Sequence, residues 1–178
     1  AMEKGTTVEQ IYAATRQLHA HGVKVAFFLQ FGYPGETFAD IEKTLSLVRE
    51  CDPDDIGISV SYPMPGTKFF NAVSETLGSR QNWQDSDDLA MLYPGPYPTA
   101  FYRKMPSVVH KEFRARKAWQ ALRHGFNLRL LGRLGYNLLS LPLARWQLNR
   151  LSRQPGNTIA LPHLPPELSA QPTPQEEQ

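Results

Sequence analysis

The stretch "VKVAFFLQFGYPGET", residues 23–37, joins an almost unbroken apolar run to a turn that contains two glycines, a proline and a glutamate. The run is too short and too uniformly apolar for a surface helix, and its Val and Phe content favours a β-strand covered on both faces. In parallel α/β folds, ligands bind beyond the carboxyl ends of the strands. The stretch therefore predicts a central parallel strand over residues 23–31, followed by a turn at a binding edge.

The turn has two interpretations. Gly32 and Gly35 would let the backbone approach a flat ligand closely, and Pro34 would stiffen the turn. Glu36, at a helix start, could accept a hydrogen bond or favour the helix dipole. An ordinary strand-to-helix turn needs the same residues for conformational reasons alone. A phosphate loop is excluded, because no Gly-Lys-Ser/Thr follows and the GxGxxG spacing is absent.

The flanking residues alternate between helix and strand patterns. Capping signals and apolar residues at helical spacing predict helices over 8–21 and 38–50, and a third helix begins near residue 67. Residues 56–62 alternate in period two, which predicts a second strand whose smaller face carries only Gly57, Ser59 and Ser61. These small residues would leave room and hydroxyls for a bound molecule, or would simply make room for large neighbours.

Two parallel strands alone would leave apolar edges unpaired, which soluble proteins avoid. We therefore expect residues 1–77 to be the back half of a larger parallel α/β domain, with further strands before Ala1 in the natural protein. An acidic, aromatic connector over 78–100 follows, which we expect to lie over the first region. Then come a basic helical region over 101–153 and a proline-rich tail over 154–178 that we expect to be disordered.

Charge divides the chain in the same way. Residues 1–100 carry a net charge of −6, whereas residues 101–153 carry +11. We expect the basic helices, with their leucine stripes, to pack against the acidic first region. Contact with an anionic membrane surface is the alternative interpretation of these helices. Nucleic-acid binding is far less favoured than either, because no recognition motif is present. Leu131, Leu134, Leu138 and Leu141 form one predicted stripe, which Pro142 should interrupt.

The chain has 178 residues, a single cysteine and five scattered histidines. Cys51 alone allows neither an intramolecular disulfide nor a cysteine-based zinc or iron-sulfur site built from this chain, and the histidine spacings predict no metal site. No apolar run approaches the roughly 18 residues of a membrane-spanning helix. We therefore expect a cytoplasmic location, with peripheral contact with a membrane as the alternative.

Three segments, in this order and spacing, resemble the back half of the catalytic domain of radical S-adenosylmethionine enzymes: "MEKGTT", "GVKVAFFLQFGYPGETFADIEKTL" and "DDIGISVSYPMPGTKFF". The similarity is nearest to the class with a cobalamin-binding domain, such as anaerobic magnesium-protoporphyrin monomethyl ester cyclase. The resemblance implies the C-terminal part of a partial (β/α)6 TIM-type barrel, an α/β fold whose fifth and sixth strands are the two predicted here.

The resemblance also implies two groups of cofactor-binding residues. The fifth-strand motif, which lies along the adenine of S-adenosylmethionine, matches Gln30, Phe31, Gly32, Pro34 and Glu36. The sixth-strand end, which touches the adenine through its backbone, matches Ser59, Ser61, Tyr62 and Pro63. Glu36 lies four residues after Gly32, whereas the common motif places its glutamate three after the glycine.

Such enzymes hold a four-iron cluster with a CxxxCxxC loop, which this chain lacks and which Cys51 cannot replace. We therefore expect the chain to be inactive without the N-terminal part of its own protein, where the cluster and cobalamin would be held. The reaction would be radical methylation or oxidation, including cyclisation, of a small-molecule or lipid-like hydrophobic substrate. The alternatives are a non-catalytic membrane-associating or scaffold module, and another barrel enzyme, for which Glu36 is the one well-placed acid.

Overall fold

The computed structural model describes residues 5–77, 89, 91–93, 95–125, 127–154 and 156. These residues form, in chain order, α1 (Val8–Ala20), β1 (Ala26–Phe31), α2 (Phe38–Cys51), β2 (Asp55–Val60), α3 (Lys68–Leu77), α4 (Thr99–His124) and α5 (Leu128–Ser152). The expected tail and most of the expected connector lie outside the described residues.

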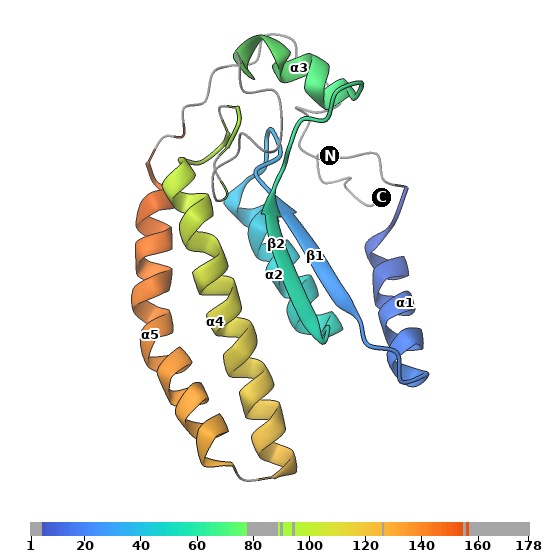
Figure 1. Cartoon of the computed structure of the whole chain (residues 1–178), viewed down its shortest axis with the longest axis vertical. Coiled ribbons are helices and arrows are strands. Elements are labelled where there is room, and N and C mark those ends of the chain that lie inside the picture. Colours follow the sequence, from blue (N-terminus) through green and yellow to red (C-terminus); the bar gives the residue numbers. More distant parts are fainter. Residues whose placement is uncertain are drawn as a thin grey trace, which may run out of the picture.

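The two strands form a parallel pair that α2 connects. Ala26 lies opposite Asp55, and Phe31 lies opposite Val60. The side chains of Leu29, Phe31, Ile56 and Val60 are buried on one face, in the same core cluster as residues of α2 and α4. Figure 1 shows α2 behind the strands, with α1 and α4 on either side. This is one strand-helix-strand unit, as the sequence predicted.

The other face of the sheet is uncovered at β1. Phe28 is 77% exposed and lies over Gly57, where an added Cβ would come within 2.9 Å of the Phe28 ring. A strand covered on both faces was therefore the wrong expectation for the described part of the chain. The physical reason is that α2 and α4 both pack on the face that holds Leu29 and Phe31.

Local capping explains where the first two helices begin. The side chains of Thr7 and Thr37 accept hydrogen bonds from the backbone of Gln10 and Asp40, and both form complete capping boxes. At the other end of α2, Asp52 adopts a left-handed conformation with φ 49°, which ends the helix before β2. The predicted helices over 8–21 and 38–50 are confirmed to within one residue at each end.

Helices α4 and α5 form a hairpin against this unit (Figure 1). The first turns of α4 bury Phe101, Tyr102 and Met105 in the main core, and α5 adds Ala144 and Leu148. Helix α5 continues through Pro142, so the predicted interruption was wrong. A proline inside a helix removes one hydrogen bond and costs about 3 kcal/mol. Packing of α5 along α4 on both sides of Pro142 offsets that cost.

The predicted packing of the basic region on the acidic region is confirmed for α4, whereas Leu131 and Leu138 of the predicted stripe on α5 are exposed. On α4, Arg116 and Lys117 lie 3.6 and 3.2 Å from the carboxylate of Asp52. A second contact reverses the signs: Glu112 of α4 accepts hydrogen bonds from Arg49 of α2 (2.6 Å) and from Arg145 of α5. Burial would raise the pKa of Glu112, but these two arginines outweigh it and hold the pKa below its usual value. Glu112 therefore joins three helices.

Candidate functional site

The turn after β1 has the geometry that its glycines and proline predict. The backbone N–H of Glu36 donates to the carbonyl of Tyr33 at 2.9 Å, with Pro34 and Gly35 between them. Gly35 has φ +80°, as the third residue of a type II turn requires. Gly32 is also left-handed, with φ +85°. Both positions therefore favour glycine for conformational reasons.

The carboxylate of Glu36 folds back onto the start of this turn. It accepts the backbone N–H of Gly32 at 2.7 Å. Burial raises the pKa of Glu36 to about 7, although the Gly32 hydrogen bond opposes the shift. A carboxyl group with such a pKa can either give or accept a proton near neutral pH.

Side chains from the connector and from α4 cover Gly32. The Tyr93 hydroxyl donates to the Gly32 carbonyl. A Cβ at Gly32 would lie 2.9 Å from Met91 Cε and 3.3 Å from Tyr102 Cε1. Both backbone polar groups of Gly32 are thus satisfied within the chain. The close approach that we expected of a ligand at this glycine is made here by the chain's own side chains.

Two buried hydroxyls lie in this region without a good partner. The Ser61 backbone N–H donates to the Phe31 carbonyl at 2.7 Å, which extends the strand pairing by one residue. Ser61 Oγ lies near the Tyr93 hydroxyl, and Tyr102 Oη lies near the Tyr97 backbone. Neither meets hydrogen-bond geometry with a described residue. Burial raises the pKa of both Tyr93 and Tyr102, so these hydroxyls stay protonated.

The structure divides the predicted cofactor-binding residues into separate groups. Gln30 and Ser59 lie directly opposite each other, half-buried, on the face that Phe28 shares. Phe31 is fully buried on the other face, so its side chain belongs to the core. Gly32, Pro34 and Glu36 form the turn described above. Beyond β2, Ser61 and Pro63 are buried, whereas Tyr62 is half-buried.

The described residues fit part of a site for S-adenosylmethionine. Gln30 offers an amide and Ser59 a hydroxyl on the same open face of the strands. Two residues after Ser59, the buried hydroxyl of Ser61 has no hydrogen-bond partner among the described residues. They do not fit an iron-sulfur cluster. Cys51 is buried in α2, and no group of three His, Cys, Asp or Glu in the described part could hold a metal ion.

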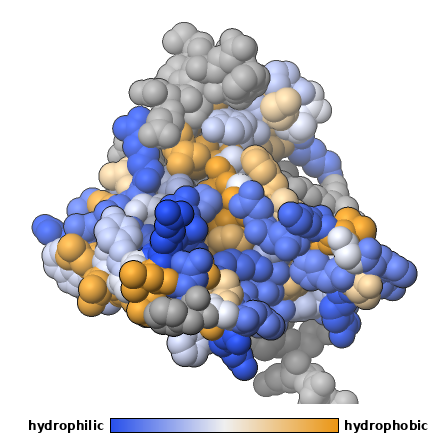
Figure 2. Space-filling view, turned by 60° about the horizontal axis from the view of Figure 1, so that its bottom comes forward, coloured by the Kyte–Doolittle hydropathy of each residue, from blue (hydrophilic) through white to orange (hydrophobic). Residues whose placement is uncertain are grey.

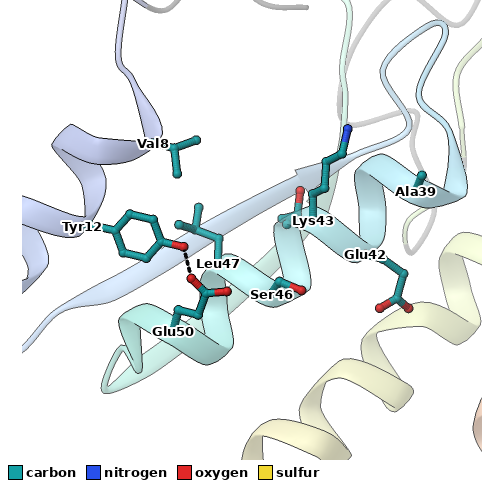
Figure 3. Close-up of a pocket in the computed structure, with 9 residues that line it drawn as sticks. Val8, Tyr12, Ala39, Glu42, Lys43, Ser46, Leu47 and Glu50 are labelled. Carbon is teal, nitrogen blue, oxygen red and sulfur yellow. Dashed lines mark hydrogen bonds between the residues drawn. The ribbon is translucent and has the colours of Figure 1, made fainter. Parts of the chain in front are cut away.

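A groove of about 610 Å³ lies elsewhere, between α1 and α2 (Figure 3). The Tyr12 hydroxyl donates to Glu50 across it, and this bond raises the pKa of Tyr12 to about 12. Along its other wall, Glu42 is paired with Arg49 at 3.5 Å, and Lys43 with Asp40 at 3.3 Å. The groove therefore offers packing surface between helices rather than convergent reactive groups.

Sequence reasoning placed the connector over the first region, which Met91 and Tyr93 confirm, but it did not single out the residues that cover the turn. These are Met91 and Tyr93 of the connector and Tyr102 at the start of α4. The aromatic content of that segment was the one available signal. The groove was also missed, because it depends on how α1 packs against α2.

Comparison with known proteins gives a partial similarity. No protein-family model matches the chain. A tRNA-2-methylthio-N(6)-dimethylallyladenosine synthase of Chromobacterium violaceum is 37% identical over 78 residues, which is 43% of this chain and 18% of that protein. Proteins of the same name from Burkholderia mallei and Burkholderia pseudomallei are 35% identical over 78 residues, covering 43% of this chain and 17% of each relative.

The chain therefore matches less than a fifth of the length of these relatives. The similarity supports a relationship to radical S-adenosylmethionine enzymes, which is the superfamily that the strand-end motifs indicated. It supports neither the cobalamin-binding class nor a cyclase-like activity. In the described part of the chain, no helix is long and apolar enough to cross a membrane.

Proposed function

We propose that residues 1–77 are the C-terminal part of the catalytic barrel of a radical S-adenosylmethionine enzyme. One observation supports this proposal above the others. The two strands are parallel and adjacent, and both end at the same edge in turns rich in glycine and proline. In barrels and other parallel sheets, that edge is where ligands bind. In this proposal β1 and β2 are the fifth and sixth strands of a partial barrel.

In the proposed site, Gln30 and Ser59 contact the adenine of S-adenosylmethionine on the open face of the strands. When bound, S-adenosylmethionine would supply a 5'-deoxyadenosyl radical, released together with methionine on one-electron reduction by a cluster held outside this chain. Glu36 keeps the turn in place through its bond to Gly32 N–H, and Tyr93 holds the Gly32 carbonyl. Backbone groups near Pro63 would complete the contact with the adenine.

The whole protein would hold the cluster and a cobalamin outside this chain, and it would methylate or oxidatively cyclise a large hydrophobic substrate in the cytoplasm. The names of the relatives concern a modified tRNA base. Because the match covers less than a fifth of those proteins, we keep a hydrophobic small molecule as the proposed substrate. A tRNA base is the second candidate, and the basic α4–α5 hairpin is the observation that favours it.

Binding of S-adenosylmethionine tests the site. The protein encoded by the whole natural reading frame would be reconstituted anaerobically, and its affinity measured by equilibrium dialysis. Gln30→Ala and Ser59→Ala should each weaken binding about three- to tenfold, because each removes one hydrogen bond. Gln17→Ala, at an exposed position of α1, is the matched control and should bind normally. Unchanged affinity in the first two variants would refute the assignment of these side chains.

A further inference from the structure

Helix α5 exposes a row of large apolar side chains that the proposed catalytic function does not use. Their exposed fractions run from 45% for Leu131 to 84% for Leu139. We call this row the apolar ridge, and it consists of Leu128, Leu131, Tyr136, Leu138, Leu139, Leu143 and Trp146. Monomeric soluble proteins rarely expose large apolar patches, so seven exposed apolar side chains on one side of a helix indicate a contact surface.

Helical geometry places the ridge on the outside of the hairpin. With about 100° per residue, Leu128, Leu139 and Trp146 fall within about 20° of one another around the helix. The buried residues of α5 lie on the opposite side, against α4. The predicted leucine stripe is therefore divided: Leu134 is buried, whereas Leu131 and Leu138 belong to the ridge. Helix α5 is apolar on both sides, and α4 covers only one of them.

Positive charge accompanies the ridge. Helix α5 carries four arginines and no acidic residue. The one acidic residue of positions 101–153, Glu112, is already bonded to Arg49 and Arg145. Cations also lie over two ridge aromatics: Arg150 is 5.9 Å from the Trp146 ring centroid, and Lys111 Nζ is 5.8 Å from that of Tyr136. In Figure 2, orange and blue residues lie side by side on the left, where Figure 1 draws α5.

We propose that the α4–α5 hairpin docks on a membrane surface containing anionic phospholipids, with the apolar ridge entering the headgroup region and the arginines binding phosphate groups. Leucine, Trp and Tyr beside Arg are the composition of helices that lie in a membrane interface. This proposal does not depend on the catalytic one.

The charge and the exposed leucines of the hairpin favour an anionic membrane over a second copy of the chain or an RNA. A second copy of the chain would bring one arginine-rich face against another, and like charges in contact are unfavourable. An RNA backbone would pair with the arginines but would leave the exposed leucines in water. An anionic bilayer satisfies both features, because its headgroups are negative and its interior is apolar.

The test is flotation, with vesicles, of the protein encoded by the whole natural reading frame. Binding is compared between vesicles of phosphatidylcholine with phosphatidylserine and vesicles of phosphatidylcholine alone. The double variant Leu139→Asn with Leu143→Asn should weaken binding about a hundredfold, at about tenfold for each leucine removed from the interface. Leu18→Asn, at an exposed position of α1, is the matched control and should bind like the unmodified chain.

A second pair of variants tests the charge. Arg129→Gln with Arg133→Gln should weaken binding to the anionic vesicles about twenty-five-fold, at about fivefold for each charge. The control is Arg16→Gln with Lys24→Gln, which removes the same charge from the first region and should have little effect. Trp146→Phe should reduce the blue shift of tryptophan fluorescence that the anionic vesicles cause.

Three results would overturn the proposal. One is no preference for the anionic vesicles. Another is binding that survives loss of both leucines. The third is a protein that does not float with vesicles and instead uses this surface for another partner. That partner would be a second copy, if the protein forms a stable dimer that the leucine variant dissociates, or RNA, if RNA binding depends on Arg129 and Arg133. All ridge substitutions are at exposed positions, and circular dichroism would verify that the variants remain folded.

Discussion

Replacing Gly32 with alanine should destabilise the protein more than the same change at another left-handed glycine. An alanine at φ +85° is strained by about 1 kcal/mol, after allowing for the lower entropy of the unfolded chain. Its Cβ would also press on Met91 Cε at 2.9 Å and on the Tyr102 ring at 3.3 Å. Met91 can move slightly, but Tyr102 is fully buried. Overpacking of this kind costs about 1–3 kcal/mol more, for a total of about 2–4 kcal/mol.

Gly22→Ala is the matched control. Gly22 has φ +71°, and a Cβ there would meet nothing within 4 Å. It should therefore cost only the backbone strain, about 1 kcal/mol. Urea unfolding followed by circular dichroism gives both free energies of unfolding. Equal losses of stability in the two variants would show that Met91 and Tyr102 do not cover Gly32.

Three further predictions concern the site and the core. Burial raises the pKa of Glu36 to about 7 from a usual 4.5, because it disfavours the charged carboxylate. The contribution of Glu36 to the free energy of unfolding should therefore be complete below about pH 4.5, where its carboxyl group is protonated, and should be lost as the pH rises through about 7. This loss of about 3 kcal/mol should be absent in Glu36→Gln, and urea unfolding of both proteins across this pH range measures it. An equal loss of stability in the variant and in the unmodified protein would contradict the prediction. Tyr93→Phe should lower the free energy of unfolding by about 1–2 kcal/mol, because it leaves the Gly32 carbonyl unpaired. Tyr102→Phe should change it little, because the Tyr102 hydroxyl has no hydrogen-bond partner among the described residues. Equal changes in the melting temperatures of the two variants would refute this contrast. Glu112→Gln should cost about 1–3 kcal/mol and Glu42→Gln about 0.5 kcal/mol or less, measured by urea unfolding, and the reverse order would count against the three-helix contact.

Local signals made the first half of the fold predictable. Thr7 and Thr37 each begin a capping box, and Gly22 follows the first helix, so the helix boundaries could be read from neighbouring residues. The period-two pattern of the second strand likewise depends on adjacent side chains. The parallel pairing followed from the length of one crossover.

The remaining features depend on contacts between distant residues. Tyr93 meets Gly32 across 61 positions of sequence. The aromatic content of the connector indicates that it covers the first region, but not that Tyr93 reaches Gly32. The apolar ridge was hidden for a related reason: leucines repeat all around α5, and only the position of α4 decides which of them are buried. Coverage of the strands was overestimated because an apolar run does not show which of its faces a helix will pack on.

We propose that this chain forms part of a radical enzyme, and formation of 5'-deoxyadenosine tests this proposal most directly. The protein of the whole natural reading frame would be expressed anaerobically, reconstituted with iron and sulfide, and mixed with S-adenosylmethionine and a reductant. We predict 5'-deoxyadenosine, in an amount that falls when the upstream cluster cysteines are replaced. A reading frame without such cysteines, together with no 5'-deoxyadenosine, would contradict the claim.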